Sequence, residues 1–159
     1  MSPMLKASLR VKALLTKTPP RAPRLLVVDD EPPMLEYVRR VLTSIGYDVV
    51  TALSGPDALS IAAAGGPFDA MVTDLVMPTM NGDELARRMR TRTPDLKVLY
   101  LTGYSDKLFK EKVVLWDDEA FLDKPASIEG LRQAVALLVY GSIEAHVSDS
   151  RPSAPTVGA

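Results

Sequence analysis

The chain has 159 residues, which is enough for one domain with a hydrophobic core and little more. It contains no cysteine and a single histidine, so the sequence argues against disulfides, a thiolate metal site, a zinc centre and a histidine-based catalytic triad. No apolar run approaches membrane-spanning length. All 20 acidic residues follow a basic first stretch, so the remainder of the chain is acidic and is not expected to bind nucleic acid directly.

Residues 1–23 are predicted to form a basic extension. Their leucines and basic residues have the spacing of a short amphipathic helix, which Pro19, Pro20 and Pro23 then interrupt. A secretory signal fits poorly, because Arg10 interrupts the apolar part. We expect a disordered arm, and a short helix that docks on an anionic surface is the alternative.

From residue 24 onward, apolar runs alternate with helical periodicities. Short apolar runs bounded by turn residues predict buried strands, and apolar residues three and four positions apart predict amphipathic helices. The predicted strands are residues 24–29, 48–52, 68–73, 97–102 and 120–123. The predicted helices are residues 31–45, 54–64, 84–92, 106–115 and 128–140. The helix at residues 106–115 has the most irregular pattern, and an acidic connection follows it.

Small polar residues mark where several of these helices begin. Ser54 and Asp57 are candidate caps for the second helix, and Ser127 is the expected cap of the last one. Asn81 and Asp83 precede the third helix and are candidate caps for it.

The periodicity of two helices also predicts which side chains face the core. In the third helix, Leu85 and Met89 are expected to point inward, and the arginines are expected to point mostly outward. The inward face of the last helix is predicted to consist of Ile128, Leu131, Val135, Leu138 and Val139. Residues 142–159 are rich in Ser, Pro, Ala and Gly, and we expect a disordered tail. The ordered domain is therefore predicted to span residues 24–141.

Five alternations of strand and helix predict an α/β fold with a parallel sheet covered on both faces. Right-handed crossovers leave few topologies. We predict a flavodoxin-like (βα)5 doubly wound sheet with strand order 2-1-3-4-5. Its switch point lies between the first and third strands, which places Asp29 and Asp30 beside Asp74.

Residues whose side chains can take part in catalysis or metal binding follow the predicted strands. Asp29 and Asp30 follow the first, Asp74 the third, Thr102 ends the fourth, and Lys124 follows the fifth. Crowded carboxylates repel one another, so a cation between them is expected, and oxygen ligands suit Mg²⁺. An Asp nucleophile, a metal, a lysine and a hydroxyl form a phosphoryl-transfer set. The alternative is an acid and lysine cluster that only closes the sheet edge, with Asp74 as a helix cap.

Four motifs of this sequence resemble those of bacterial two-component response regulator receiver domains, and the resemblance spans about residues 24–140. They are VVDDEP at residues 27–32, DLVMP at 74–78 with Asn81-Gly82, LTG at 101–103, and FLDKP at 121–125. The combination is specific, although each motif alone is weak. The segments at residues 103–106 and 120–125 are most similar to receivers of hybrid sensor kinases.

The resemblance implies roles for the site residues. Asp74 would be the phosphoacceptor, taking the group from a histidine kinase or a histidine phosphotransfer protein. Asp30, Asp74 and the backbone carbonyl of Val76 would hold Mg²⁺, with the help of Asp29. Lys124 would bind the phosphoryl group.

A switch is also implied by the resemblance. Thr102 would move toward the phosphoryl group, and Phe121 would swing inward. Phe121 is often Tyr in the family, so any role for a hydroxyl there is lost. The face built from the fourth helix, fifth strand and fifth helix would contact an output protein of unknown identity or a second copy of the chain.

The function that follows is a phosphorylation-controlled signalling switch, cytoplasmic, stand-alone and not an enzyme in the ordinary sense. A constitutive scaffold that needs no phosphorylation is one alternative. A phosphatase or phosphotransferase that forms an aspartyl phosphate is another. Such enzymes usually need a second acid near the nucleophile, and Val76 stands two residues after Asp74.

Overall fold

The computed structural model describes residues 21–103 and 118–141 of the chain. Five parallel strands form one sheet in the order β2-β1-β3-β4-β5, which confirms the predicted fold class and strand order. The strands are β1 (Arg24–Val28), β2 (Asp48–Ala52), β3 (Ala70–Asp74), β4 (Lys97–Thr102) and β5 (Glu119–Asp123). The described helices are α2 (Pro32–Ser44), α3 (Gly55–Gly65), α4 (Gly82–Met89) and α6 (Ile128–Tyr140).

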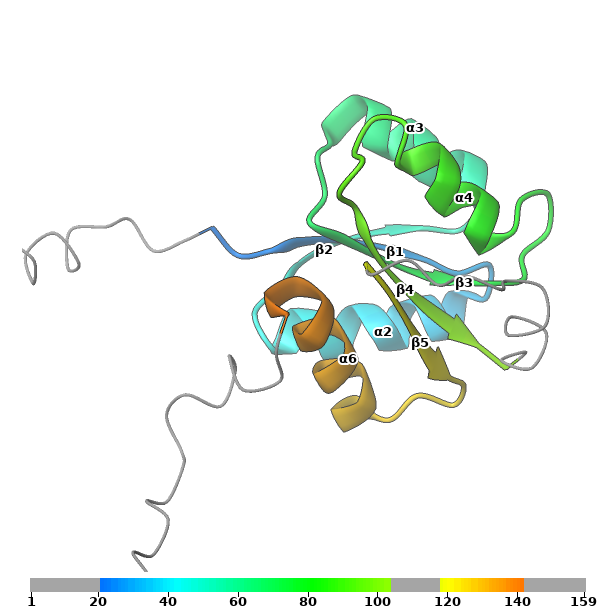
Figure 1. Ribbon diagram of the computed structural model, residues 1–159. Coiled ribbons are helices and arrows are strands. Elements are labelled where there is room, and N and C mark those ends of the chain that lie inside the picture. The colour runs from blue at the N-terminus through cyan, green and yellow to red at the C-terminus, as the bar shows by residue number, and fades with distance from the viewer. Residues whose placement is uncertain (1–20, 104–117, 142–159) are drawn as a thin grey trace, which may run out of the picture.

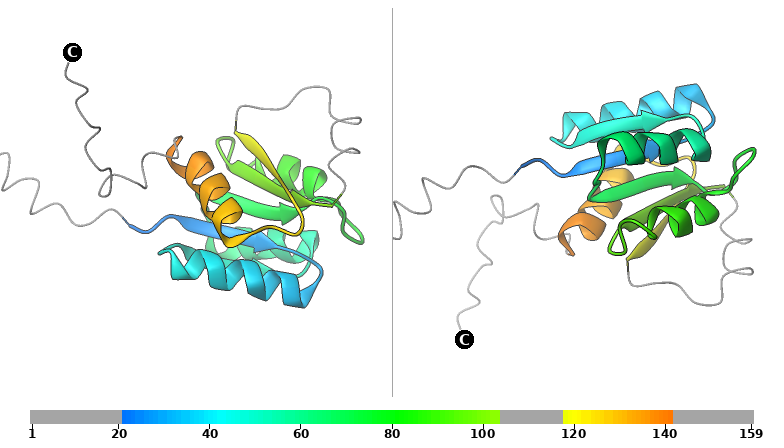
Figure 2. Two further views of the ribbon diagram at one scale, coloured as in Figure 1. Left: turned by 90° about the horizontal axis from the view of Figure 1, so that it is seen from below. Right: turned by 90° about the horizontal axis from the view of Figure 1, so that it is seen from above.

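Helices cover both faces of the sheet. Figure 1 shows α3 and α4 on one face and α2 and α6 on the other, and the left view of Figure 2 looks onto α2 and α6. In β1, Leu26 and Val28 pack in the core beneath α3 and α4, whereas Leu25 and Val27 pack beneath α2 and α6. Successive side chains of a strand point to opposite faces, so a strand covered on both faces is apolar throughout.

The strand order brings together two strand ends that are distant in the sequence. β3 pairs with β1, with Val28 opposite Thr73, although β2 and two helices separate them along the chain. The direction of the crossovers reverses between β1 and β3, so their carboxyl ends leave a crevice between the following loops. Asp29 follows β1 directly and Asp74 is the last residue of β3.

The predicted caps at Ser54 and Ser127 are confirmed. The Ser54 hydroxyl accepts a hydrogen bond from the Asp57 N–H at 3.2 Å, and the Ser127 hydroxyl accepts one from the Gly130 N–H at 2.9 Å. Asp57 therefore lies in the first turn of α3, where its charge suits the positive end of the helix dipole. Gly141, with φ of 73°, ends α6 in the left-handed conformation.

The helix predicted at residues 84–92 begins and ends earlier than expected. α4 starts at Gly82, with Asn81 at the N-cap position, and ends at Met89. The Asn81 side chain does not cap the helix, because its carbonyl oxygen accepts a hydrogen bond from the Met77 N–H at 3.4 Å. Asp83, the other candidate cap, lies in the first turn. The Asn81 side chain therefore supports the preceding loop instead of capping α4.

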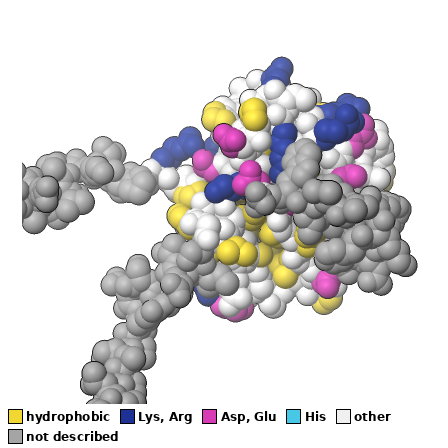
Figure 3. Space-filling model, in the orientation of Figure 1, with side chains coloured by type: hydrophobic (Ala, Val, Ile, Leu, Met, Phe, Trp, Pro, Cys, Tyr) yellow, Lys and Arg dark blue, Asp and Glu magenta, His cyan; other side chains and the backbone are white. Residues whose placement is uncertain are grey.

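One prediction of side-chain exposure is wrong, and another has one exception. Ile128 is 62% exposed, because it opens α6 one turn before the buried Leu131. The arginines of the third predicted helix point mostly outward as expected, but only 8% of the Arg90 side chain is exposed, because it forms an ion pair with Glu119. Figure 3 shows basic and acidic side chains interspersed over the α3 and α4 side. Exposed ion pairs of Glu84 with Arg87 and Arg88 belong to this mixed surface.

Several predictions fall on residues that the structure does not describe. They are the arm up to residue 20, the helix at residues 106–115 and the tail at residues 142–159. The division of the chain into extension, domain and tail therefore stays a prediction. Among the described residues, no helix combines the length and the hydropathy needed to cross a bilayer.

Candidate functional site

Three acidic side chains gather at the carboxyl edge of the sheet, as the sequence predicts. Asp29 and Asp30 follow β1, and Asp74 ends β3. One carboxylate oxygen from each residue lies within 4.8 Å of the other two. Asp29 and Asp74 are 2% and 9% exposed, and Asp30 is half-buried. The structure therefore holds three acids in one partly buried cluster.

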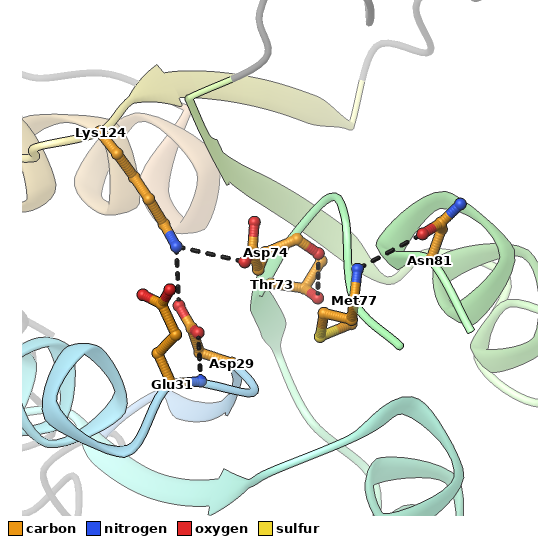
Figure 4. Close-up of polar contacts among 7 residues, drawn as sticks. All are labelled: Asp29, Glu31, Thr73, Asp74, Met77, Asn81 and Lys124. Atoms are coloured by element: carbon orange, nitrogen blue, oxygen red, sulfur yellow. Dashed lines mark hydrogen bonds and ion pairs between the residues drawn. The ribbon is translucent and has the colours of Figure 1, made fainter. Parts of the chain in front are cut away.

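Lys124, which follows β5, reaches into this cluster (Figure 4). Its Nζ donates hydrogen bonds to Asp29 Oδ2 at 3.1 Å and to Asp74 Oδ2 at 3.2 Å. The other carboxylate oxygen of Asp29 accepts a hydrogen bond from the Glu31 N–H at 2.9 Å. A single ammonium group therefore connects the ends of β1, β3 and β5.

The cluster carries more negative than positive charge. Burial raises the pKa of Asp74, Lys124 lowers it, and Asp29 and Asp30 raise it again, so that the net shift is upward. Burial lowers the pKa of Lys124, but hydrogen bonds and charges from Asp29 and Asp74 outweigh this, so its pKa is raised. One ammonium group does not neutralise three carboxylates, so the remaining negative charge favours the binding of a second cation.

The donor set fits a hard divalent cation. The three carboxylates offer oxygen ligands close enough together to share one ion. Mg²⁺ prefers oxygen ligands, and proteins commonly hold it by one or two carboxylates together with water and phosphate oxygens. Asp29, Asp30 and Asp74 could therefore hold Mg²⁺, with a phosphoryl group as a further ligand.

The loop after Asp74 is held by short-range hydrogen bonds. The Gly82 N–H donates to the Leu75 carbonyl at 2.7 Å, and Asn81 binds the Met77 N–H (Figure 4). The Thr73 hydroxyl donates to the Asp74 carbonyl at 2.9 Å. These bonds fold the loop back onto the end of β3, and so they fix the position of the Asp74 backbone.

The other predicted site residues lie around this edge. Thr102 is fully buried at the end of β4, and its carbonyl accepts a hydrogen bond from the Lys124 N–H at 3.2 Å. Val76 is 38% exposed, whereas its neighbours Leu75 and Met77 are buried. Phe121 lies in the middle of β5, partly buried, on the face covered by α3 and α4.

Sequence reasoning missed a buried polar network near Phe121. Glu119, the first residue of β5, has a fully buried side chain that binds Arg90 and Tyr100. The only signal in the sequence was the acidic connection before β5. That signal did not indicate which acid turns inward or which arginine meets it.

A pocket lined mainly by apolar residues lies elsewhere on the described part of the chain. It has a volume of about 280 Å³ and lies at the opposite edge of the sheet, between the carboxyl ends of α3 and α4. Its lining includes Leu59, Phe68 and Met89, with Arg88 and Arg92 among the polar contributors. No member of the acid cluster lines this pocket, so the pocket is separate from the candidate functional site.

Comparisons with known proteins agree with the motifs and the geometry. A family model described as the response regulator receiver domain matches residues 25–136. The chain is 38% identical over 112 residues to the sensor kinase CckA of Brucella abortus, a match that covers 70% of this chain and 12% of that protein. It is 39% identical over 110 residues to the response regulator MprA of Mycolicibacterium vanbaalenii, covering 68% of this chain and 46% of that protein. The chain therefore spans less than half the length of these relatives.

Solved structures with the same fold include two of direct interest. The receiver domain of the hybrid histidine kinase CckA is 29% identical, with a TM-score of 0.62, covering 73% of this chain and 98% of that one. The response regulator TrrA of Thermotoga maritima, in complex with Mg²⁺ and BeF, is 33% identical, with a TM-score of 0.64 and the same two coverages.

Proposed function

Because the chain belongs to the response regulator receiver domain family, we propose that it is a signalling switch controlled by phosphorylation of Asp74. Receiver domains are signalling domains, and they interact with histidine kinases or histidine phosphotransfer proteins. The observation that carries the assignment to Asp74 is the convergence of Lys124, Asp29 and Asp30 on its carboxylate. A cluster that only closed the sheet edge would not need a third acid.

The proposed reaction transfers a phosphoryl group from a donor histidine. An oxygen of Asp74 forms a bond to phosphorus while the bond between phosphorus and the donor imidazole breaks. The imidazole leaves in its neutral form if its other ring nitrogen carries a proton, and Asp74 becomes an acyl phosphate. Lys124 binds an oxygen of the phosphoryl group, and Thr102 is the hydroxyl that moves toward it.

Asp29, Asp30, Asp74 and the backbone carbonyl of Val76 are the groups we propose to hold Mg²⁺. When bound, the ion would neutralise charge on the phosphoryl oxygens. The MgBeF complex of TrrA supports this as a property of a relative that shares the fold.

Mg²⁺ should stabilise the folded chain by binding to the acid cluster. At a Mg²⁺ concentration ten times its dissociation constant, linkage predicts about 1.4 kcal/mol of added unfolding free energy. Asp30→Asn should remove most of this gain, because it removes one of three carboxylates. The exposed turn residue Asp95, replaced by Asn, is the matched control. Thermal unfolding with and without Mg²⁺ measures the effect, and an equal gain in both variants would refute the assignment.

The direct test of the function is intact mass after incubation with Mg²⁺ and a small phosphodonor. We expect one added phosphoryl group. No adduct, even with a range of histidine kinases as donors, would favour the constitutive scaffold. Turnover of a small-molecule phosphate ester, with the chain regenerated at each cycle, would favour the phosphatase reading instead.

Phosphorylation is proposed to change a partner-binding face. By resemblance this face comprises the fourth predicted helix, which lies outside the described residues, together with β5 and α6. Leu137 and Tyr140 on α6 are 46% and 44% exposed and could serve such contacts. Phe121 would be the switch aromatic that connects this face to Thr102. The partner could be an output protein or a second copy of the chain.

Val76 should slow the loss of the phosphoryl group. It is an exposed apolar residue of the loop directly after Asp74, and its bulk would hinder the hydrolytic water. Val76→Ser should therefore speed dephosphorylation by up to roughly tenfold, which corresponds to about 1.4 kcal/mol of barrier. Leu53→Ser, at another exposed apolar residue, is the control and should leave the rate unchanged. Decay of the phosphorylated mass over time gives the rate, and equal rates for wild type and Val76→Ser would contradict this. Tyr104, expected to act in the same way, lies outside the described residues.

A further inference from the structure

A buried network of polar groups connects three elements on the α3 and α4 face of the sheet. Arg90, which directly follows α4, donates from Nη1 to Glu119 Oε1 at 2.8 Å and from Nε to the Leu96 carbonyl at 3.0 Å. The Tyr100 hydroxyl donates to the same Glu119 oxygen at 3.0 Å. The residue after α4, the middle of β4 and the start of β5 are therefore joined at the Glu119 carboxylate, and Arg90 also binds the residue before β4.

The side chains of this network are buried. The Glu119 side chain is 0% exposed, that of Arg90 is 8% exposed, and Tyr100 is fully buried. Burial raises the pKa of Tyr100, and the charge and hydrogen bond of Glu119 raise it further, so the hydroxyl stays neutral and donates. A buried carboxylate with such donors has few alternative positions, because any movement would leave a charge without its partner.

The aromatic ring of Tyr100 also stacks against that of Phe121. The two residues are opposite each other on the paired strands β4 and β5, and their ring centroids are 5.3 Å apart with an angle of 12° between the planes. Stacked aromatic pairs at such distances attract one another beyond the apolar area that they bury. The hydroxyl end of Tyr100 is fixed by Glu119, so the ring offers Phe121 a fixed surface.

We propose that Arg90, Glu119 and Tyr100 form a latch that holds Phe121 in its stacked position and thereby sets how readily the chain switches. The inference rests on the proposed function in one respect, namely that Phe121 leaves this stacked position when Asp74 is phosphorylated. Leaving the stack costs the interaction with Tyr100, so the latch opposes switching. None of the three residues touches the acid cluster in the described contacts, and their role is to position Phe121.

Weakening the latch should make activation easier. Tyr100→Leu removes the stacking surface, and it should tighten binding of beryllofluoride with Mg²⁺ by roughly two- to tenfold, the factor expected for one aromatic pair. Tyr100→Phe keeps the ring and removes the hydroxyl, so its effect should be smaller and in the same direction. Isothermal titration of the full chain with Mg²⁺ and beryllofluoride measures both.

The matched controls lie on the other face of the sheet. Tyr47 is a buried tyrosine, 5% exposed, in the core beneath α2 and α6. Tyr47→Leu and Tyr47→Phe remove the same groups from a comparable environment and should lower the melting temperature without tightening beryllofluoride binding. A purely structural role for Tyr100 would make the two pairs of variants behave alike.

A second measurement reports on Phe121 without any phosphoryl chemistry. The chain contains three phenylalanines, so labelling with 4-fluorophenylalanine should give three ¹⁹F resonances, and the resonance lost in Phe121→Leu identifies Phe121. In the absence of Mg²⁺ and beryllofluoride, Tyr100→Leu should shift or broaden this resonance, whereas Tyr47→Leu should not.

The two measurements separate the possible failures. An unchanged Phe121 resonance, or unchanged affinity in Tyr100→Leu, overturns the latch while leaving the proposed function intact. A wild-type chain that binds no beryllofluoride overturns the proposed function, and the switching role of the latch with it, even if the resonance shifts. A shifted resonance together with tighter binding supports the latch.

Discussion

Replacing Asp74 by Asn should abolish phosphoryl acceptance. The carboxamide is a poor nucleophile and cannot form an acyl phosphate, while its size and shape match those of the carboxylate. Intact mass after incubation with Mg²⁺ and a small phosphodonor should show one added phosphoryl group in wild type. In the variant, labelling should fall to background.

The same variant should remain folded. Burial and the neighbouring acids together raise the pKa of Asp74 despite Lys124, so the folded state disfavours the ionised form relative to the unfolded chain. At neutral pH a neutral amide removes that unfavourable charge, and the melting temperature in the absence of Mg²⁺ should be equal or higher. A loss of labelling would then reflect chemistry, since the folded population is preserved.

Asp123→Asn is the control for position. Asp123 is an exposed acid at the end of β5, directly before Lys124 and therefore at the same edge of the sheet. This variant should accept the phosphoryl group as wild type does. If Asp74→Asn were labelled at the wild-type rate, or if Asp123→Asn lost labelling instead, the phosphoacceptor would have to be reassigned.

The strand order and the acid cluster could be predicted because they depend on local patterns. β1 and β3 are apolar runs that end at acids, and right-handed crossovers bring such ends to one edge. The presence of Lys124 at this edge follows from the same rule. Its contacts with both Asp29 and Asp74 are a matter of side-chain reach, which spacing in the sequence does not determine.

The predictions that failed depend on tertiary partners. Arg90 belongs to a row of arginines with nearly identical sequence context, and only the position of Glu119 distinguishes it. Asn81 has the composition of a cap, but the free Met77 N–H in the preceding loop competes for its side chain. Ile128 fits the helical periodicity, yet its side chain at the start of α6 is exposed. In each case the outcome depends on tertiary contacts, which the local sequence pattern does not specify.

Gly82→Ala should destabilise the fold more than any other single methyl addition at a described glycine. A Cβ atom at Gly82 would clash with the Asp74 carbonyl oxygen and would lie 3.1 Å from Cγ2 of Thr73. The nearest obstacle is backbone, which cannot rotate away, and the Gly82 N–H is bound to the Leu75 carbonyl at 2.7 Å. We expect a loss of about 3 kcal/mol of unfolding free energy, at the upper end of overpacking costs.

Two other glycines give a graded comparison. At Gly55 the added Cβ would meet Met80, with the sulfur at 2.8 Å, and this flexible side chain can move aside at a smaller cost. At Gly65 the nearest atom is the Arg24 Nη2 at 3.7 Å, an ordinary contact, so Gly65→Ala should change stability by at most about 0.5 kcal/mol. Urea unfolding should therefore rank the losses as Gly82, then Gly55, then Gly65.

The position of Gly82 makes its effect functional as well as structural. Relief of the clash must move either the start of α4 or the carbonyl of Asp74, and the loop between them includes Val76. Gly82→Ala should therefore slow phosphorylation under conditions where the variant is still folded, whereas Gly65→Ala should not. A Gly82→Ala chain with the unfolding midpoint of wild type would contradict this prediction, because it would mean that the start of α4 accommodates a Cβ atom beside the Asp74 carbonyl oxygen.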